Sequence, residues 1–315
     1  MIGMAAVLLL TNGGKSFGQH RAEPIPFGDM DQWVDRQIKE SSVIGGKVKH
    51  VFEIAPSMLI KGDSPYSNMG GSPWATSNVM AKVAGITKTN TSVFPEKRGD
   101  GYCARLDTRM ESVKVLGLVN ITVLAAGSVF TGSMHEPIKS TKNPQKLLQT
   151  GIAFTKKPIA LQFDYKANVA EVENRVRATG FSKITSIPGK DYPTVVLFLQ
   201  KRWEDAAGNI YAKRVGTLVH YFYHSTDWKD NSSFEIMYGD IRDRAEYKPH
   251  MMRLNVTENY TVNSKGESVP IHEVDWANGD EYPTHLYVQF SSSHGGAYIG
   301  APGNSLWVDN VKLLY

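Results

Sequence analysis

The chain has 315 residues, of which 41% are hydrophobic and 21% charged, so it can bury a core and is not disordered as a whole. Its 35 lysines and arginines nearly balance 31 acidic residues, leaving a net charge of +4. The basic residues do not gather in one stretch, so we expect no nucleic-acid partner. The single cysteine, Cys103, excludes an internal disulfide, and its alternating surroundings predict a buried thiol.

The first residues resemble a secretory signal. Met4–Leu10 is an apolar run, although no basic residue precedes it, and small residues follow at Ser16–Gly18. This pattern predicts a signal peptide over residues 1–18 and one domain over residues 19–315. Neither this run nor any later one reaches the roughly 18 to 20 apolar residues of a membrane-spanning helix. We therefore expect an exported protein that is periplasmic, at the cell surface or secreted.

The sequence of the mature chain predicts many short strands. Its 28 glycines and 15 prolines separate runs rich in Val, Ile, Thr and aromatic residues. Residues 159–165 and 284–290 alternate between apolar and polar positions, which is typical of antiparallel sheets with one solvated face. The positions expected to share a buried face include Leu161, Phe163, Leu286, Val288 and Phe290.

Other segments depart from simple alternation. Residues 193–199 form a continuous apolar run, which predicts a strand buried on both faces. Residues 305–315 place Leu306 and Val308 on one side and Asp309 and Val311 on the other. Weak helix signals are confined to 29–40 and 145–148, and long polar connections are expected over 61–90 and 131–149.

Three groups of motifs carry a family resemblance. The C-terminal group consists of Pro-Thr-His within 282–286, Ser-Ser-Ser-His-Gly-Gly within 291–298, and Leu-Trp-Val-Asp within 303–311. The middle group is 126–132 with 151–154, and the N-terminal group is 71–78. Together they resemble the putative carbohydrate metabolism domain family of exported proteins in Gram-negative gut bacteria.

Residues 27–33 also resemble the opening strand of galactose-binding-like sandwiches. The two resemblances imply an all-β, jelly-roll β-sandwich of the galactose-binding-like kind, with long loops and little helix. They also imply a role in glycan use, with a polysaccharide or oligosaccharide as partner. They supply no catalytic residue.

Sugar binding needs flat aromatic faces for the apolar side of a pyranose, together with polar groups for its hydroxyls. Aromatic residues in polar or glycine-rich surroundings are candidate platforms, although each can instead fill the core. The candidates are Trp74, Trp203, Trp228, Trp276 and Tyr298.

A glycoside hydrolase needs two carboxyl groups roughly 5 to 10 Å apart. The sequence does not reveal which carboxyls meet, and an exposed, solvated carboxylate is the alternative for each. The candidates are Asp164, Glu204, Glu235, Asp240 and Asp243.

A structural Ca²⁺ between the first and last strands is a further hypothesis, since Ca²⁺ prefers carboxylate and carbonyl oxygens. Asp309 matches the acidic residue of the closing strand, and Asp29 or Asp31 that of the opening one. The alternative is that Asp309 makes a hydrogen bond or salt bridge. No cofactor is required otherwise.

Three functions remain open at this point. The first is a non-catalytic glycan-binding protein, favoured by the resemblance and by aromatic residues in loops. The second is a glycoside hydrolase that uses two of the candidate carboxylates. The third is a structural or adhesion protein that binds a protein partner through a sandwich edge.

Overall fold

The computed structural model describes residues 21–83, 85–115, 119–139, 143–180, 183–251, 254 and 259–315. The predicted signal peptide, residues 1–18, lies outside this part. The described part contains no α-helix, and three 3-10 turns are its helical elements, which confirms an all-β fold with little helix. These turns are η1 (Ser42–Ile44), η2 (Pro144–Leu147) and η3 (Pro249–Met251). No helix in it is long and apolar enough to cross a membrane.

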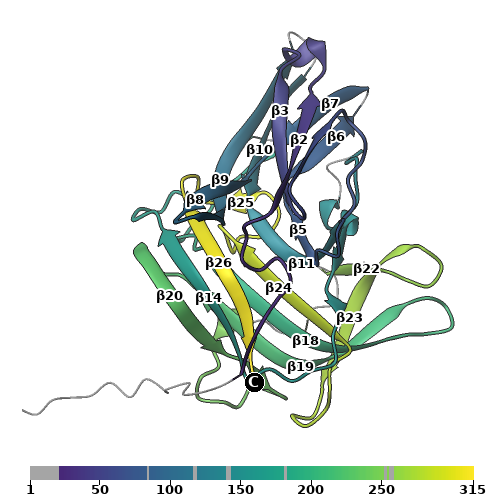
Figure 1. Cartoon of the computed structure of the whole chain (residues 1–315), viewed down its shortest axis with the longest axis vertical. Helices are drawn as coiled ribbons and strands as arrows, with labels where there is room; N and C mark the ends of the chain where they lie inside the picture. The colour runs from purple at the N-terminus through teal and green to yellow at the C-terminus, as the bar shows by residue number, and fades with distance from the viewer. Residues whose placement is uncertain are drawn as a thin grey trace, which may run out of the picture.

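Two large sheets pack face to face as a β-sandwich (Figure 1). The eight-stranded sheet has the order β16-β10-β9-β26-β14-β20, with β1 beside β26 and β8 beside β9. Its strands are β1 (Ala22–Pro24), β8 (Val93–Arg98), β9 (Gly101–Val115), β10 (Val119–Ala126), β14 (Ala160–Asn168), β16 (Thr179–Gly180), β20 (Thr226–Glu235) and β26 (Ser305–Leu314).

The ten-stranded sheet has the order β12-β11-β24-β18-β19-β23-β22, with β5 on β11, β13 on β24 and β21 on β19. Its strands are β5 (Trp74–Thr76), β11 (Ser128–Met134), β12 (Leu148–Thr150), β13 (Ile152–Ala153), β18 (Thr194–Glu204), β19 (Ile210–Tyr221), β21 (Met237–Tyr238), β22 (Tyr260–Val262), β23 (Ser268–Trp276) and β24 (His285–Ser291).

Three small sheets complete the fold, and two of them lie beside the upper ends of β9 and β10 (Figure 1). These two are the sheet β3-β2-β4 and the hairpin β6-β7, and the third is β17-β15-β25. Their strands are β2 (Trp33–Lys39), β3 (Val48–Ile54), β4 (Met58–Lys61), β6 (Val79–Val83), β7 (Ile86–Asn90), β15 (Val176–Arg177), β17 (Thr185–Ser186) and β25 (Ile299–Gly300).

The main core lies between the two large sheets and is built by the alternation that the sequence predicts. Leu161 and Phe163 of β14 are fully buried in it, as are Leu286, Val288 and Phe290 of β24. The Phe163 ring packs edge-on against Phe290 at 4.9 Å between ring centroids, joining the sheets. These predicted core positions are confirmed.

The closing strand β26 departs from the predicted alternation of buried and exposed residues. Val308 and Val311 are both buried in the main core, so they face the same side despite an odd spacing. Asn310 between them adopts a left-handed backbone with φ of 53°, and the register between β14 and β26 shifts here. One extra residue at a bulge changes which face the following residues occupy. The simple alternation expected for 305–315 therefore holds only up to the bulge.

Of the other local predictions from the sequence, some are confirmed and some are wrong. Residues 194–200 are all buried, with Leu197 in the main core and Phe198 in a second cluster, which confirms a strand buried on both faces. The helix signal over 29–40 is wrong, because β2 occupies Trp33–Lys39 with alternating burial. The expected connection over 61–90 contains β5, β6 and β7, since short hairpins with little apolar content resemble loops in sequence.

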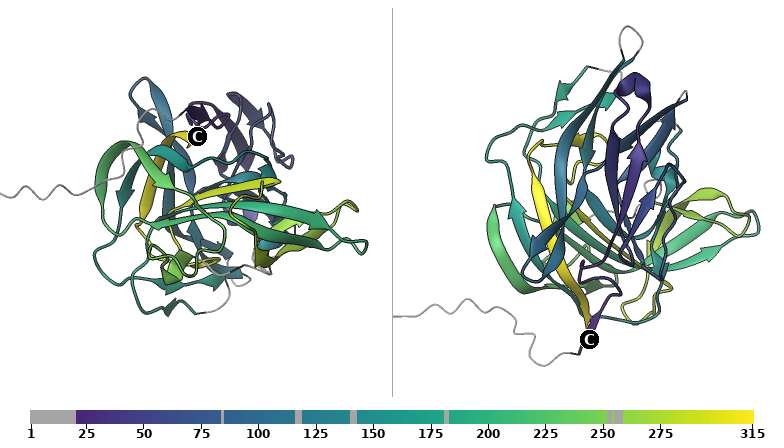
Figure 2. Two further views of the ribbon diagram at one scale, coloured as in Figure 1. Left: turned by 90° about the horizontal axis from the view of Figure 1, so that it is seen from below. Right: turned by 45° about the horizontal axis from the view of Figure 1, so that its top comes forward.

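The hairpin of β18 and β19 extends beyond the sandwich as an arm, with β22 and β23 beside it (Figures 1 and 2). In this arm β18 pairs antiparallel with β19, and β19 pairs parallel with β23. Three neighbouring strands from two distant parts of the chain thus form one rigid surface.

Candidate glycan-binding site

Three aromatic rings lie side by side across the arm. Trp203 of β18 pairs in register with Tyr211 of β19, which in turn pairs with His272 of β23. The ring centroids are 5.8 Å apart for Trp203 and Tyr211, and 5.7 Å for Tyr211 and His272. Trp203 is 42% exposed, and the other two side chains are half-buried. We call these three residues the aromatic row.

The opposite face of the same strands is tied together by buried polar contacts. Glu273 of β23 accepts hydrogen bonds from Gln200 of β18 at 2.7 Å and from Nε of Arg214 of β19 at 2.5 Å. The guanidinium of Arg214 also lies 3.7 Å from the ring centroid of Phe198. These contacts fix the three strands relative to one another, so the aromatic row is held in place before any ligand arrives.

The charges beside the aromatic row are balanced. Lys201 pairs with Glu281 at 2.9 Å, and Lys213 lies 4.0 Å from Asp275. All four side chains are at least partly exposed, so their pairing contributes little to stability. The row thus offers aromatic faces between paired charges.

The other predicted platforms differ in how far their aromatic rings are exposed to solvent. Trp74 is only 1% exposed, donates its indole N–H to Pro26, and packs against Phe290. Trp276 is also buried, and Tyr298 is half-buried. A ring closed in by protein has no free face for a sugar, so Trp74 and Trp276 belong to the core.

The remaining platform, Trp228, lies in a charged group on the outer face of the eight-stranded sheet. The Arg98 guanidinium lies 3.9 Å from the centroid of its ring. One nitrogen of Arg98 donates to Asp164 at 2.8 Å and to Asp309 at 2.6 Å, and the other to Asp230 at 2.6 Å. This Arg98 cluster unites one predicted platform, one predicted catalytic carboxylate and one predicted calcium ligand.

The two buried carboxylates of the Arg98 cluster differ in acidity. Burial raises the pKa of Asp309 to about 6, despite the hydrogen bond from Arg98. Burial also opposes ionisation of Asp164. However, hydrogen bonds from the backbone N–H of Asn231 and from Arg98 outweigh this effect and hold the pKa of Asp164 below its usual value. Neighbouring carboxyls whose pKa values are pushed apart are one mark of acid–base pairs.

The other four candidate carboxylates do not join this group. Glu204 accepts hydrogen bonds from the backbone and hydroxyl of Ser264, near the tip of the arm. Asp240 pairs with Arg242, two residues along the chain. The last two, Glu235 and Asp243, are exposed. Within the described residues, Asp164 is therefore the one catalytic candidate that meets a second buried carboxylate.

The calcium hypothesis does not fit the residues present. Asp309 is occupied by the Arg98 cation, which would repel a Ca²⁺ on the same oxygen. Asp31 instead accepts the backbone N–H of Tyr102 at 2.7 Å, and Asp29 is exposed. No group of three or more His, Cys, Asp or Glu in the described part of the chain is placed to hold a metal ion.

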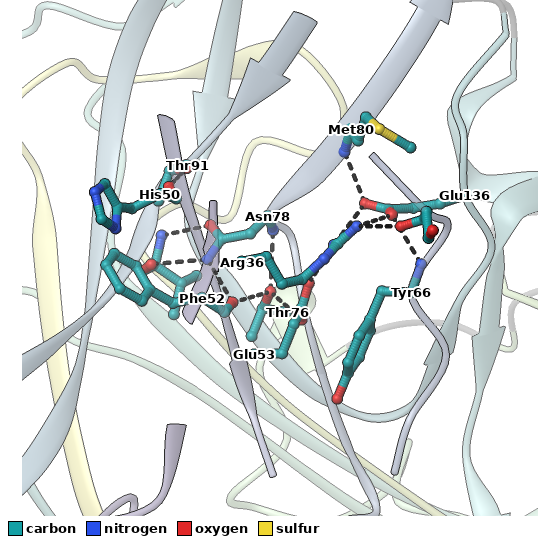
Figure 3. Close-up of polar contacts among 12 residues, drawn as sticks. Arg36, His50, Phe52, Glu53, Tyr66, Thr76, Asn78, Met80, Thr91 and Glu136 are labelled. Atoms are coloured by element: carbon teal, nitrogen blue, oxygen red, sulfur yellow. Dashed lines mark hydrogen bonds and ion pairs between the residues drawn. The ribbon is translucent and has the colours of Figure 1, made fainter. Parts of the chain in front are cut away.

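A second arginine network, shown in Figure 3, joins residues of β2, β3, β5 and β6 to Glu136, which follows β11. The Arg36 guanidinium is held by Glu136 at 2.5 and 3.1 Å and by Glu53 at 3.2 Å. Thr76 donates to Glu53, and the backbone N–H of Met80 donates to Glu136. Every charged side chain of this Arg36 network is buried. A site closed to solvent in this way holds the fold together and does not reach a substrate.

Sequence reasoning missed several of these residues. Tyr211 and His272 join the aromatic row only because of the parallel pairing of β19 with β23, which no local pattern indicates. Arg98 stands 66 positions from Asp164 along the chain. The prediction for Cys103 is confirmed, since the thiol is 1% exposed and burial raises its pKa to about 12.

A comparison with known protein families identifies the family of the chain. The chain belongs to the family described as the putative carbohydrate metabolism domain, whose sequence profile matches residues 52–314. A solved structure, described as a putative glycoside hydrolase from Bacteroides thetaiotaomicron, is similar with a TM-score of 0.45 and 15% identity, over 86% of this chain and 81% of that one. No curated protein matches the sequence. A glycan-related role for the chain follows from the family.

Proposed function

We propose that the chain is an exported glycan-binding protein and that the aromatic row binds the sugar. The observation that carries this proposal is the register of Trp203, Tyr211 and His272 across three adjacent strands. Aromatic faces bury the apolar side of a sugar ring, and the indole and imidazole nitrogens supply hydrogen bonds at the edges. Export is proposed from the signal-like run at Met4–Leu10.

Two further features support binding at the row. Gln200, Arg214 and Glu273 fix the strands from behind, so little ordering of the protein is needed on binding. The row also lies on the arm that extends from the sandwich (Figures 1 and 2), and Trp203 is 42% exposed there.

The test is retention of the mature chain, residues 19–315, in gels that contain soluble polysaccharides. We expect retention by at least one polysaccharide and an affinity about tenfold or more lower for Trp203→Ala, because a central aromatic contact commonly contributes more than 1 kcal/mol. Tyr223→Ala is the matched control, since both side chains are 42% exposed and Tyr223 lies outside the row.

Three outcomes would contradict the proposal. The first is that the wild-type chain binds none of a broad polysaccharide panel. The second is that Trp203→Ala binds as tightly as wild type. The third is that Tyr223→Ala loses as much affinity as Trp203→Ala, which would move the site to the rings around Tyr223.

A glycoside hydrolase is the second candidate, and the Arg98 cluster is the observation that favours it. Asp164 and Asp309 accept from the same nitrogen, so they lie within reach of the roughly 5 to 5.5 Å separation of a retaining pair. We rank this candidate second because the Arg98 guanidinium lies between the two carboxylates and fills the space that a glycosidic bond needs. The test is to incubate polysaccharides with the protein and measure new reducing ends. If the wild-type chain produces them and each of the single variants Asp164→Asn and Asp309→Asn does not, hydrolysis at this site is established.

A further inference from the structure

A groove with a volume of about 380 Å³ lies beside the C-terminal end of β26, which is marked C in Figure 1. Its walls come from four segments, namely the start of β1, the connection between β13 and β14, the connection between β23 and β24, and the residue that follows β26. We call it the cationic groove, and its lining includes Arg21, Glu23, Lys156, Lys157, Tyr282 and Tyr315.

The groove has more positive than negative side chains. Three of the lining side chains are cations and one, Glu23, is a carboxylate, which pairs with Lys156 at 2.5 Å. Among the described residues, no carboxylate forms an ion pair with Arg21 or Lys157. Lys157 instead donates to the carbonyl of Gly279 at 2.6 Å. Within the described part of the chain, two cations at this groove are therefore not neutralised by a carboxylate side chain and can meet an anion.

Aromatic rings stand next to these cations. Tyr282 is 66% exposed, and the Lys157 ammonium lies 5.5 Å from the centroid of its ring. On the other side, the Lys156 ammonium lies 5.8 Å from the centroid of the Tyr315 ring. An exposed ring beside an ammonium is suited to a ligand with an apolar face and an anionic group.

We propose that the cationic groove binds an acidic sugar, a saccharide that carries a carboxylate or a sulfate. The sugar ring packs against Tyr282, while its anionic group meets Lys157 and Arg21. Arginine suits this role because its planar guanidinium donates two parallel hydrogen bonds to a carboxylate or sulfate. The groove shares no lining residue with the aromatic row, whose neighbouring charges are paired, and the proposal does not rest on binding there.

The experiment uses the mature chain on an array of neutral, uronate-containing and sulfated oligosaccharides. We expect binding to acidic oligosaccharides that weakens as salt is raised, because partly exposed charges are screened. The double variant Arg21→Ala, Lys157→Ala should lose about tenfold or more in affinity for them. The matched control, Lys183→Ala with Lys190→Ala, removes the same charge from exposed lysines outside the groove.

Further variants separate this proposal from the aromatic row. Tyr282→Ala should also weaken acidic binding, whereas Trp203→Ala should leave it unchanged. Uronate and sulfate oligosaccharides compared at equal length show which anion the groove prefers, and preference for either one supports the proposal. It is overturned if no acidic oligosaccharide binds, if the lysine control loses as much affinity as the groove variant, or if Tyr282→Ala binds as wild type.

Discussion

The molecule contains two arginine clusters that solve the same electrostatic problem in different ways. In the Arg36 network the arginine and both glutamates are buried, and burial raises the pKa of Glu53 to about 8. Burial thus favours the neutral form of Glu53, while Glu136 accepts two hydrogen bonds from the Arg36 guanidinium. In the Arg98 cluster, three carboxylates surround one arginine whose side chain is 20% exposed.

The difference shows how solvent access sets the number of charges that a cluster tolerates. Without water, the Arg36 network reaches balance by keeping a proton on Glu53, since an uncompensated buried charge is strongly unfavourable. At the surface, water and the exposed Asp230 complete the Arg98 cluster without full neutralisation. The first network is therefore structural, while the second keeps groups that can meet a ligand.

The largest expected effect comes from breaking the buried network. Arg36→Met leaves Glu136 buried without its cation, so we expect a loss of about 3–5 kcal/mol in the free energy of unfolding. Urea denaturation at pH 7 measures this change. Glu53→Gln is the control, because it keeps the charge balance, and it should cost far less. Equal losses for the two variants would refute the balance described above.

A smaller effect is expected at the surface. Arg98→Ala removes the partner of Asp164 and Asp309 and the contact with Trp228, so we expect a loss of about 1–2 kcal/mol in the free energy of unfolding. Arg98→Lys should recover only part of it, since one ammonium cannot span the same carboxylates. A loss as large as that of Arg36→Met would show that solvent does not moderate this cluster.

The pH dependence of stability sharpens the comparison further. The pKa of Glu53 in the folded protein, about 8, lies above its ordinary value of 4.5, so the folded state binds an additional proton between these values. The free energy of unfolding should therefore fall as pH rises from about 4.5 to about 8. Urea denaturation across this range should show a shallower fall for Glu53→Gln, and an unchanged slope would contradict the assignment.

Asp309 should contribute in the same direction over a narrower range. Its pKa in the folded protein is about 6, compared with an ordinary value of 3.8, so its contribution is lost as pH rises from about 4 to about 6. In Asp309→Asn this part of the pH dependence should disappear, while the part above pH 6 remains. A variant that alters the slope above pH 6 instead would assign the titration to another group.

The smallest effect is expected at the pair of Asp240 and Arg242, which is exposed and local in sequence. Arg242→Ala should leave the urea midpoint unchanged within error, because solvent screens such pairs. This variant also serves as the baseline for the preceding ones. A clear shift of its midpoint would indicate a role that exposure alone does not explain.

Much of the sandwich was predictable because its signals are local. Alternation identified Phe163 and Phe290 as core residues, and the continuous run 193–199 identified a strand with two buried faces. The bulge at Asn310 was not predictable, since one left-handed residue leaves no period in the sequence and yet reverses the face of all that follows.

The candidate sites were predictable only in part. Composition placed both Trp74 and Trp203 in polar surroundings, but the tertiary packing buries one and exposes the other. The neighbours that complete each site come from distant strands, as Tyr211 and His272 do at the aromatic row. A single sequence contains the residues of such a site without the pairing that assembles it.

The arrangement of the rings in the aromatic row bears on the shape of the ligand that can bind to it. Neighbouring strands in a sheet rotate by about 20–25° relative to each other. The planes of neighbouring rings are also inclined to each other, by 23° for Trp203 and Tyr211 and by 39° for Tyr211 and His272. The three rings therefore do not share one plane. We expect such a surface to suit a dissolved chain that winds along its length, and to fit poorly on the flat face of a crystalline polymer.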